Sequence, residues 1–284
     1  MELSSIHTMK KSLLNLINRV NKDKGETDMP NISGFESVPR RALHIFYVLD
    51  TSGSMSGTPI ATLNRAMEET VVALKDVANK NADAQLKIAV MEFNTKARWV
   101  TANGPEDMED FIWEDLKAMG LTSMGDALKE LDEKMSRSGF LESMTGAYMP
   151  IIILMTDGQA TDDYKKALEK IRGNKWFKRG TKIAFALGDY ADRVMMEEIV
   201  GNPEAVIETN DLEAFASMLK LASVTSSMLQ SISRTVDLDG KDVIEQLKGD
   251  SLPGESGIIG TPEPPFPIDD PPIDIGGGWP EDWN

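Results

Sequence analysis

Residues 43–55 read LHIFYVLDTSGSM, and this stretch decides the fold. Residues 43–49 form an almost wholly apolar, partly β-branched run, which has the length and composition of a buried central strand. The run stops at Asp50, and a turn of hydroxyl residues and glycine follows before a predicted helix. We therefore expect Asp50, Ser52 and Ser54 at the carboxyl end of a parallel strand, the edge at which open α/β sheets bind ligands.

Asp50, Ser52 and Ser54 alternate along this turn at positions i, i+2 and i+4. Their short side chains carry oxygen atoms, so they can converge on one hard cation without displacing a backbone hydrogen bond. A second apolar strand, predicted at residues 150–156, also ends in a carboxylate, Asp157. Two buried strands therefore finish with aspartate at the same edge of the sheet.

The rest of the domain alternates predicted strands and helices, which indicates an α/β fold with a doubly wound, mostly parallel sheet and right-handed crossovers. The strand at residues 97–100 is expected to pair antiparallel with the strand before it, because only three residues separate them. The predicted strands cover residues 43–49, 85–93, 97–100, 150–156, 181–187 and 205–208. The predicted helices cover residues 60–80, 106–117, 123–138, 165–176, 192–200 and 211–233.

Three parts of the chain are predicted: an N-terminal helix and linker at 1–38, the α/β domain at 39–233, and an acidic tail at 234–284. Residues 4–20 place apolar side chains at helical spacing, so this amphipathic helix packs on the domain or on a partner. Residues 249–284 hold eight prolines, seven glycines and eight acidic residues but no lysine or arginine. Such a segment cannot form its own core, and it is either a docking peptide or a solubilising tail.

The composition argues against some classes of binding partner and excludes some kinds of chemistry. The formal net charge of -16 argues against duplex nucleic acid or an anionic membrane and favours cations and basic protein surfaces. The chain has no cysteine, which excludes disulfides, thiolate catalysis and cysteine-ligated zinc. No secretory signal and no run of about 20 apolar residues is found, so we expect a cytoplasmic protein.

The series Asp50, Ser52, Ser54, Thr122 and Asp157 resembles the metal-ion-dependent adhesion site of the von Willebrand factor A domain family. All five motif positions occur in the family's order, each on the strand end or loop where the family has it. The resemblance implies that the two serines and the threonine supply hydroxyl oxygens to Mg²⁺ or Mn²⁺. It implies that the two aspartates balance the charge of the ion and act on it either directly or through water.

In that family the ion accepts one further carboxylate from a partner, so the resemblance implies a protein-interaction module and not an enzyme. The family resemblance covers residues 43–223, and within the family the details look most like bacterial stand-alone A domains of the TerY type. The segments YVLDTSGSM, GLTSMGDAL and ILMTDGQATDD and the closing segment LEAFASMLKLAS carry this closer match. Those proteins are associated with tellurium resistance and with stress or phosphosignalling gene clusters. The closer match implies a scaffold or regulator in stress response, phosphosignalling or defence.

A metal-dependent hydrolase, either a phosphatase or a nuclease, is the alternative function. In it Asp157 or Asp50 would activate a metal-bound water. The chain has two histidines, and His44 falls inside the first predicted strand, where a packed residue is expected. No Ser-His-Asp triad is therefore expected.

Two further acidic groups are open to interpretation. Asp162 and Asp163 are expected to begin a helix. The alternative is that these two residues are additional metal ligands. Asp269, Asp270 and Asp274 of the tail are carboxylates that could reach the metal site of their own chain or of a neighbouring copy.

Overall fold

The computed structural model describes residues 40–141, 147–232 and 240–249. The predicted amphipathic helix at residues 4–20 lies outside the described residues, and so do residues 250–284 of the predicted tail. All of the described residues belong to one compact unit.

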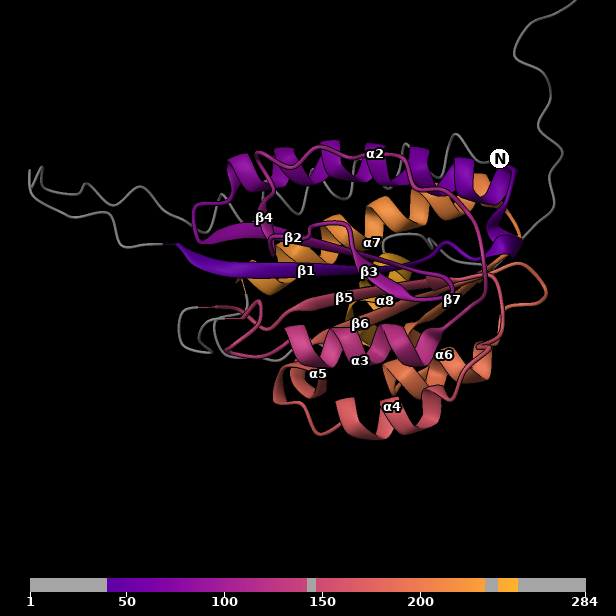
Figure 1. Cartoon of the computed structure of the whole chain (residues 1–284). Helices are drawn as coiled ribbons and strands as arrows, with labels where there is room; N and C mark the ends of the chain where they lie inside the picture. The colour runs from indigo at the N-terminus through magenta and orange to yellow at the C-terminus, as the bar shows by residue number, and fades with distance from the viewer. Residues whose placement is uncertain (1–39, 142–146, 233–239, 250–284) are drawn as a thin grey trace, which may run out of the picture. The chain divides into compact units, whose positions relative to one another are not determined.

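The described chain alternates strands with helices, as predicted (Figure 1). The strands are β1 (Arg41–Asp50), β2 (Ala84–Phe93), β3 (Ala97–Trp99), β4 (Glu106–Asp107), β5 (Ile151–Thr156), β6 (Thr181–Leu187) and β7 (Val206–Thr209). The α-helices are α2 (Thr58–Lys80), α3 (Met124–Lys134), α4 (Tyr164–Ile171), α5 (Lys175–Arg179), α6 (Arg193–Val200), α7 (Leu212–Ile232) and α8 (Gly240–Gly249). Two short 3₁₀ helices are η1 (Gly53–Met55) and η2 (Pro203–Ala205).

The strands form one sheet in the order β3-β2-β1-β5-β6-β7, and β4 pairs with β2 beside this row. Strand β1 is parallel to β2 and β5, β5 is parallel to β6, and β6 is parallel to β7. Strands β3 and β4 run antiparallel to β2. The predicted α/β class with a mostly parallel sheet is therefore confirmed, and β1 lies near its centre as expected.

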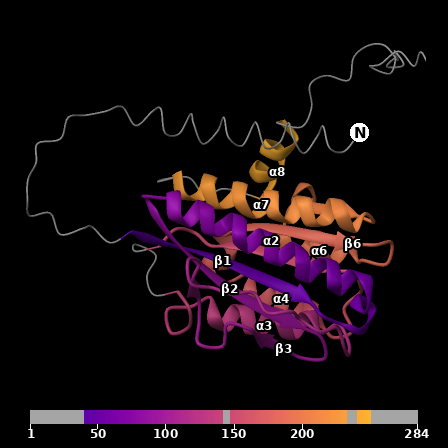
Figure 2. The ribbon, with the colours of Figure 1, turned by 90° about the horizontal axis from the view of Figure 1, so that it is seen from above.

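Helices cover both faces of the sheet, with α2 and α7 on one side and α3, α4 and α6 on the other (Figures 1 and 2). The side chains of β1 alternate between two cores: Ile45 and Tyr47 belong to the first, Phe46 and Val48 to the second. Because β1 is buried on both faces, its sequence from Leu43 to Leu49 is almost wholly apolar and does not alternate.

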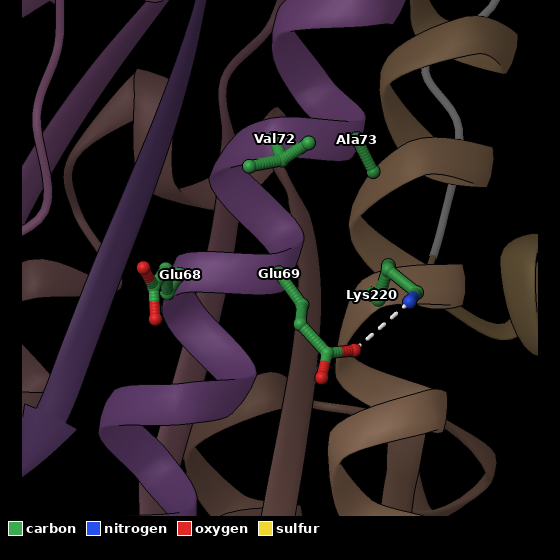
Figure 3. A pocket seen from close by; sticks show the side chains of 5 residues that line it. All are labelled: Glu68, Glu69, Val72, Ala73 and Lys220. Carbon is green, nitrogen blue, oxygen red and sulfur yellow. Dashed lines mark hydrogen bonds and ion pairs between the residues drawn. The ribbon is translucent and has the colours of Figure 1, made fainter.

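Helices α2 and α7 pack side by side over the first core (Figure 2). An ion pair of 3.1 Å joins Glu69 of α2 to Lys220 of α7. A groove between the two helices is lined by five residues, Glu68, Glu69, Val72, Ala73 and Lys220 (Figure 3). None of these belongs to the predicted metal site.

The predicted helix at residues 106–117 is wrong. Residues 106 and 107 form β4, which pairs with Lys87 and Ile88 of β2, and the chain after it is irregular. Met108 and Phe111 are buried at a spacing that imitates a helix face. The backbone of Leu116 bonds instead to the side chain of Asn64, which accepts from its N–H at 2.9 Å and donates to its carbonyl at 3.0 Å.

Two further elements differ from the expectation. The predicted helix at residues 165–176 is divided into α4 and α5, because Asn174 accepts hydrogen bonds from the N–H groups of Trp176 and Phe177 and so begins a new helix. Helix α8 lies inside the range assigned to the tail, and its Val243 and Ile244 are buried in the first core. Among the described helices none is long and apolar enough to cross a membrane.

Candidate metal centre

Asp50 ends β1 and is fully buried. One carboxylate oxygen accepts a hydrogen bond of 2.7 Å from the N–H of Ser52, which fixes the turn after the strand. The other accepts a bond of 2.5 Å from the hydroxyl of Thr156, the last residue of β5. Burial raises the pKa of Asp50 to about 6, against the lowering effect of these hydrogen bonds.

The turn after β1 forms η1 and presents its serine hydroxyls in a row. The hydroxyl oxygens of Ser52 and Ser54 lie 3.0 Å apart, within hydrogen-bond distance. The Ser54 hydroxyl donates to the Asp157 carboxylate at 2.7 Å, and Ser54 is exposed to solvent. Burial raises the pKa of Asp157 above its usual range. Three oxygen side chains from two strand ends therefore meet at one point of the surface.

Thr122 lies in the loop before α3, and hydrogen bonds to Thr161 hold both its N–H group and its carbonyl group. Its N–H donates to the hydroxyl of Thr161 at 3.2 Å, and its carbonyl accepts from the N–H of Thr161 at 2.8 Å. A Cβ atom placed on Gly158 would lie 3.6 Å from the Thr122 hydroxyl and 3.9 Å from the Ser54 hydroxyl. Both hydroxyls therefore lie beside Gly158, the residue after Asp157.

Backbone hydrogen bonds join the serine turn to the loop that carries Thr122. The N–H of Gly53 donates to the carbonyl of Gly120 at 3.0 Å, and the N–H of Met119 donates to the carbonyl of Thr51 at 2.8 Å. Gly120 has a φ of +77°, which an L-residue rarely adopts. The structure thus brings all five predicted site residues to the carboxyl edge of the sheet and fixes their loops to one another.

Asp162 has a role that the sequence analysis did not identify. Its two carboxylate oxygens accept hydrogen bonds from the N–H groups of Gly125 at 2.8 Å and Asp126 at 2.9 Å. It therefore caps α3, a helix distant in sequence, whereas a cap of α4 was expected. Asp163 takes the N-cap position of α4 without a side-chain capping bond. The sequence gives no signal for this role, because Ser123 occupies the N-cap position of α3 and serine is a preferred cap, yet its side chain makes no capping bond.

His44 lies inside β1, six positions before Asp50, and is buried. Its Nδ1 has no hydrogen-bond partner. Burial, with a smaller effect of Lys87, lowers its pKa to about 4, so the ring is neutral near pH 7. It is a packed core residue, as expected.

The donor set at this edge fits a hard divalent cation. It consists of two carboxylates and three hydroxyls, which are oxygen ligands of the kind Mg²⁺ and Mn²⁺ prefer. No cluster of three or more carboxylate or imidazole side chains suited to a metal occurs within the described ranges. A metal at this edge would therefore depend on the hydroxyls of Ser52, Ser54 and Thr122.

Comparison with protein families gives one match: the von Willebrand factor type A domain matches residues 44–221. No curated protein matches the chain.

Solved structures that are similar to this chain include the following three. Proximal thread matrix protein 1 from the mussel byssus, whose MIDAS motif is occupied by zinc, has 19% identity and a TM-score of 0.49, over 66% of this chain and 48% of that one. The pilus adhesin SpaC from Lactobacillus rhamnosus GG, in its open conformation, has 11% identity and a TM-score of 0.50, over 77% of this chain and 31% of that one. A von Willebrand factor type A protein from Catenulispora acidiphila has 18% identity and a TM-score of 0.47, over 66% of this chain and 43% of that one. This chain spans less than half the length of each of these chains, and the likeness concerns the fold.

Proposed function

Because this chain belongs to the von Willebrand factor type A domain family, we propose that its strand-edge site is a complete metal-ion-dependent adhesion site. Ser52, Ser54 and Thr122 hold Mg²⁺ or Mn²⁺ through their hydroxyls, and Asp50 and Asp157 balance its charge. When bound, the ion supplies an electrophilic centre that accepts a carboxylate from a protein partner. The domain thereby acts as a metal-dependent protein-interaction module.

One observation carries this proposal: the row of oxygens from Ser52 through Ser54 to Asp157, with spacings of 3.0 and 2.7 Å. Ser54, the middle residue of this row, is exposed, so a partner can approach the ion from solvent. Its inner support, Asp50, is buried and held by two hydrogen bonds, which keeps the turn in place. Such preorganised donors lower the cost of ordering a site when it binds.

We propose that the site binds and does not catalyse. Of the chain's two histidines, the described one, His44, is buried in β1 away from the strand edge, so the described part of the edge offers carboxylates and hydroxyls but no imidazole base. A metal-dependent phosphatase or nuclease would hydrolyse p-nitrophenyl phosphate or its diester with Mn²⁺. We expect no turnover above that of the Ser52→Ala/Ser54→Ala variant. Turnover that this variant loses would assign the hydrolase instead.

The cellular setting that we propose is a cytoplasmic scaffold or regulator of a bacterial stress-response, phosphosignalling or defence system. The resemblance of four sequence segments to TerY-type A domains supports it. The net charge of -16 supports basic proteins as partners and disfavours nucleic acid and anionic membranes. Two sources of the carboxylate are proposed, a partner protein and the acidic tail of this chain.

Calorimetric titration of Mg²⁺ and Mn²⁺ into the metal-stripped full chain tests the proposal. We expect one ion per chain in the wild type and binding weaker by about 100-fold or more in Ser52→Ala/Ser54→Ala, since even changes behind the ligands cost 10- to 100-fold. Ser56→Ala is the control, because Ser56 is an exposed serine of the same turn outside the predicted motif. Equal affinity in the wild type and the double variant would overturn the proposal.

A further inference from the structure

Large apolar side chains are exposed around the candidate metal site. Six such side chains are strongly exposed in the described part of the chain: Val72, Ile112, Met119, Leu121, Tyr190 and Val194. Four of the six lie in the loops and helix start at the carboxyl edge of the sheet. We call these four the apolar rim: Met119 (59% exposed), Leu121 (55%), Tyr190 (85%) and Val194 (63%).

Both halves of the apolar rim are attached directly to the metal-site loops. Met119 and Leu121 flank Gly120, whose carbonyl accepts from the N–H of Gly53 between the two serines. Tyr190 and Val194 belong to the loop after β6 and the first turn of α6. That segment is tied to the site by the N–H of Asp192, which donates to the carbonyl of Gly158 at 3.2 Å.

This arrangement defines the chemistry of a matching ligand. The ion requires a carboxylate, and the apolar rim requires apolar side chains next to that carboxylate. A purely polar acidic peptide would leave the rim exposed to water and would forgo the stabilisation of about 25 cal/mol for each Å² of apolar surface buried. The matching ligand is therefore an aspartate or glutamate with a large apolar neighbour.

The tail of this chain contains that ligand twice. Residues 267–269 and 272–274 both read Pro-Ile-Asp. In each copy the proline fixes one backbone dihedral before the isoleucine, which reduces the conformational entropy lost on docking. Two residues, Asp270 and Pro271, separate the two copies.

We propose that a Pro-Ile-Asp segment of the chain's own tail docks on the apolar rim of the same molecule, with isoleucine on the rim and aspartate at the ion. This proposal rests on the proposed metal function. Residues 250–268 separate Gly249 from Asp269, the aspartate of the first segment, and these 19 residues can extend up to about 65 Å. The ten residues of β1 span about 33 Å, so the tail can reach the metal edge from either end of the sheet.

The docked tail acts as a built-in competitor of external partners. Tethering gives it an effective concentration on the order of millimolar, which lets a weak ligand compete. An external protein then binds only when its own carboxylate and apolar contacts exceed those of the tail. Because the segment occurs twice, removal of one aspartate leaves the other in place.

Photocrosslinking in the full chain tests this proposal. Tyr190→p-benzoylphenylalanine places the crosslinker on the apolar rim, and Val72→p-benzoylphenylalanine is the control, since Val72 is also exposed but lies in the groove between α2 and α7. With Mn²⁺, we expect a crosslink from position 190 to residues 266–275 at monomer mass, lost with a chelator and absent from position 72. No such crosslink, a crosslink only at dimer mass, or one indifferent to the chelator would each overturn the proposal.

Mn²⁺ affinity provides the second measurement. Neutralising the aspartates in Asp269→Asn/Asp270→Asn/Asp274→Asn should weaken Mn²⁺ binding by about two- to tenfold, because a millimolar tethered ligand stabilises the loaded state by that factor. The control Glu255→Gln/Glu281→Gln/Asp282→Asn removes the same charge outside the two segments and should bind as the wild type does. Equal Mn²⁺ affinity of the two triple variants overturns the docking.

The two proposals fail differently. If the wild type binds Mn²⁺ through Ser52 and Ser54 but position 190 does not reach the tail, the metal function stands and tail docking is wrong. If the wild type binds no Mn²⁺, the metal function is wrong, and tail docking is wrong with it.

Discussion

The hydroxyl of Ser54 donates a hydrogen bond of 2.7 Å to the carboxylate of Asp157, although 103 positions separate the two residues in the sequence. Ser54 follows β1 and Asp157 follows β5, which are neighbouring parallel strands of the sheet. Their contact arises because parallel strands end at the same edge. The candidate metal site is thus a direct product of the strand order.

Asp162 stabilises the fold by capping α3 and so positions the loop that carries Thr122. We expect Asp162→Ala to lower the free energy of unfolding by about 1–2 kcal/mol, because two backbone N–H groups lose their acceptor. Asp163→Ala is the control and should change it by less than about 0.5 kcal/mol, since Asp163 makes no side-chain cap. Urea unfolding measures both, and equal losses would contradict the assigned role.

Gly120 and Gly188 have the same φ of +77° but different surroundings. A Cβ atom on Gly120 would clash with the hydroxyl of Thr95, whereas one on Gly188 would meet nothing within 4 Å. We expect Gly188→Ala to cost about 1 kcal/mol of stability and Gly120→Ala about 3 kcal/mol, because the second adds a steric clash to the backbone strain. Thermal or urea unfolding tests this order, and a reversed order would show that the loop has another conformation.

His44 makes stability depend on pH. Burial lowers its pKa from 6.5 to about 4, so the unfolded chain takes up a proton at a higher pH than the folded chain does. Its contribution is complete above pH 6.5 and is lost as the pH falls toward 4. From pH 7.5 to 5 we expect the free energy of unfolding to fall by about 2 kcal/mol through this residue.

The variant His44→Gln, compared with His7→Gln, isolates this effect. Urea unfolding at the two pH values should show a smaller fall for His44→Gln alone. An unchanged pH dependence in that variant would show that other groups cause the loss.

The fold and the position of the candidate site could be predicted because both follow from the apolar strands and their carboxyl ends. Residues 43–49 and 150–156 are apolar because they are buried on both faces, and this signal is local in the sequence. The segment after β4 could not be predicted, because Asn64 bonds the backbone of Leu116 from 52 positions away. The role of Asp162 is equally non-local, since α3 takes its cap from a loop that follows the next strand. Helix α8 is short, and its burial depends on contacts with α7, η2 and β6.

Diffraction from crystals of the full chain soaked in Mn²⁺, recorded at the manganese absorption edge, tests the central claim most directly. The account predicts an anomalous peak at coordination distance from the hydroxyls of Ser52 and Ser54, next to Asp157. In the Ser52→Ala/Ser54→Ala variant this peak should disappear. A manganese peak at any other place, with none beside the two serines, would contradict the assignment of this edge as the metal site.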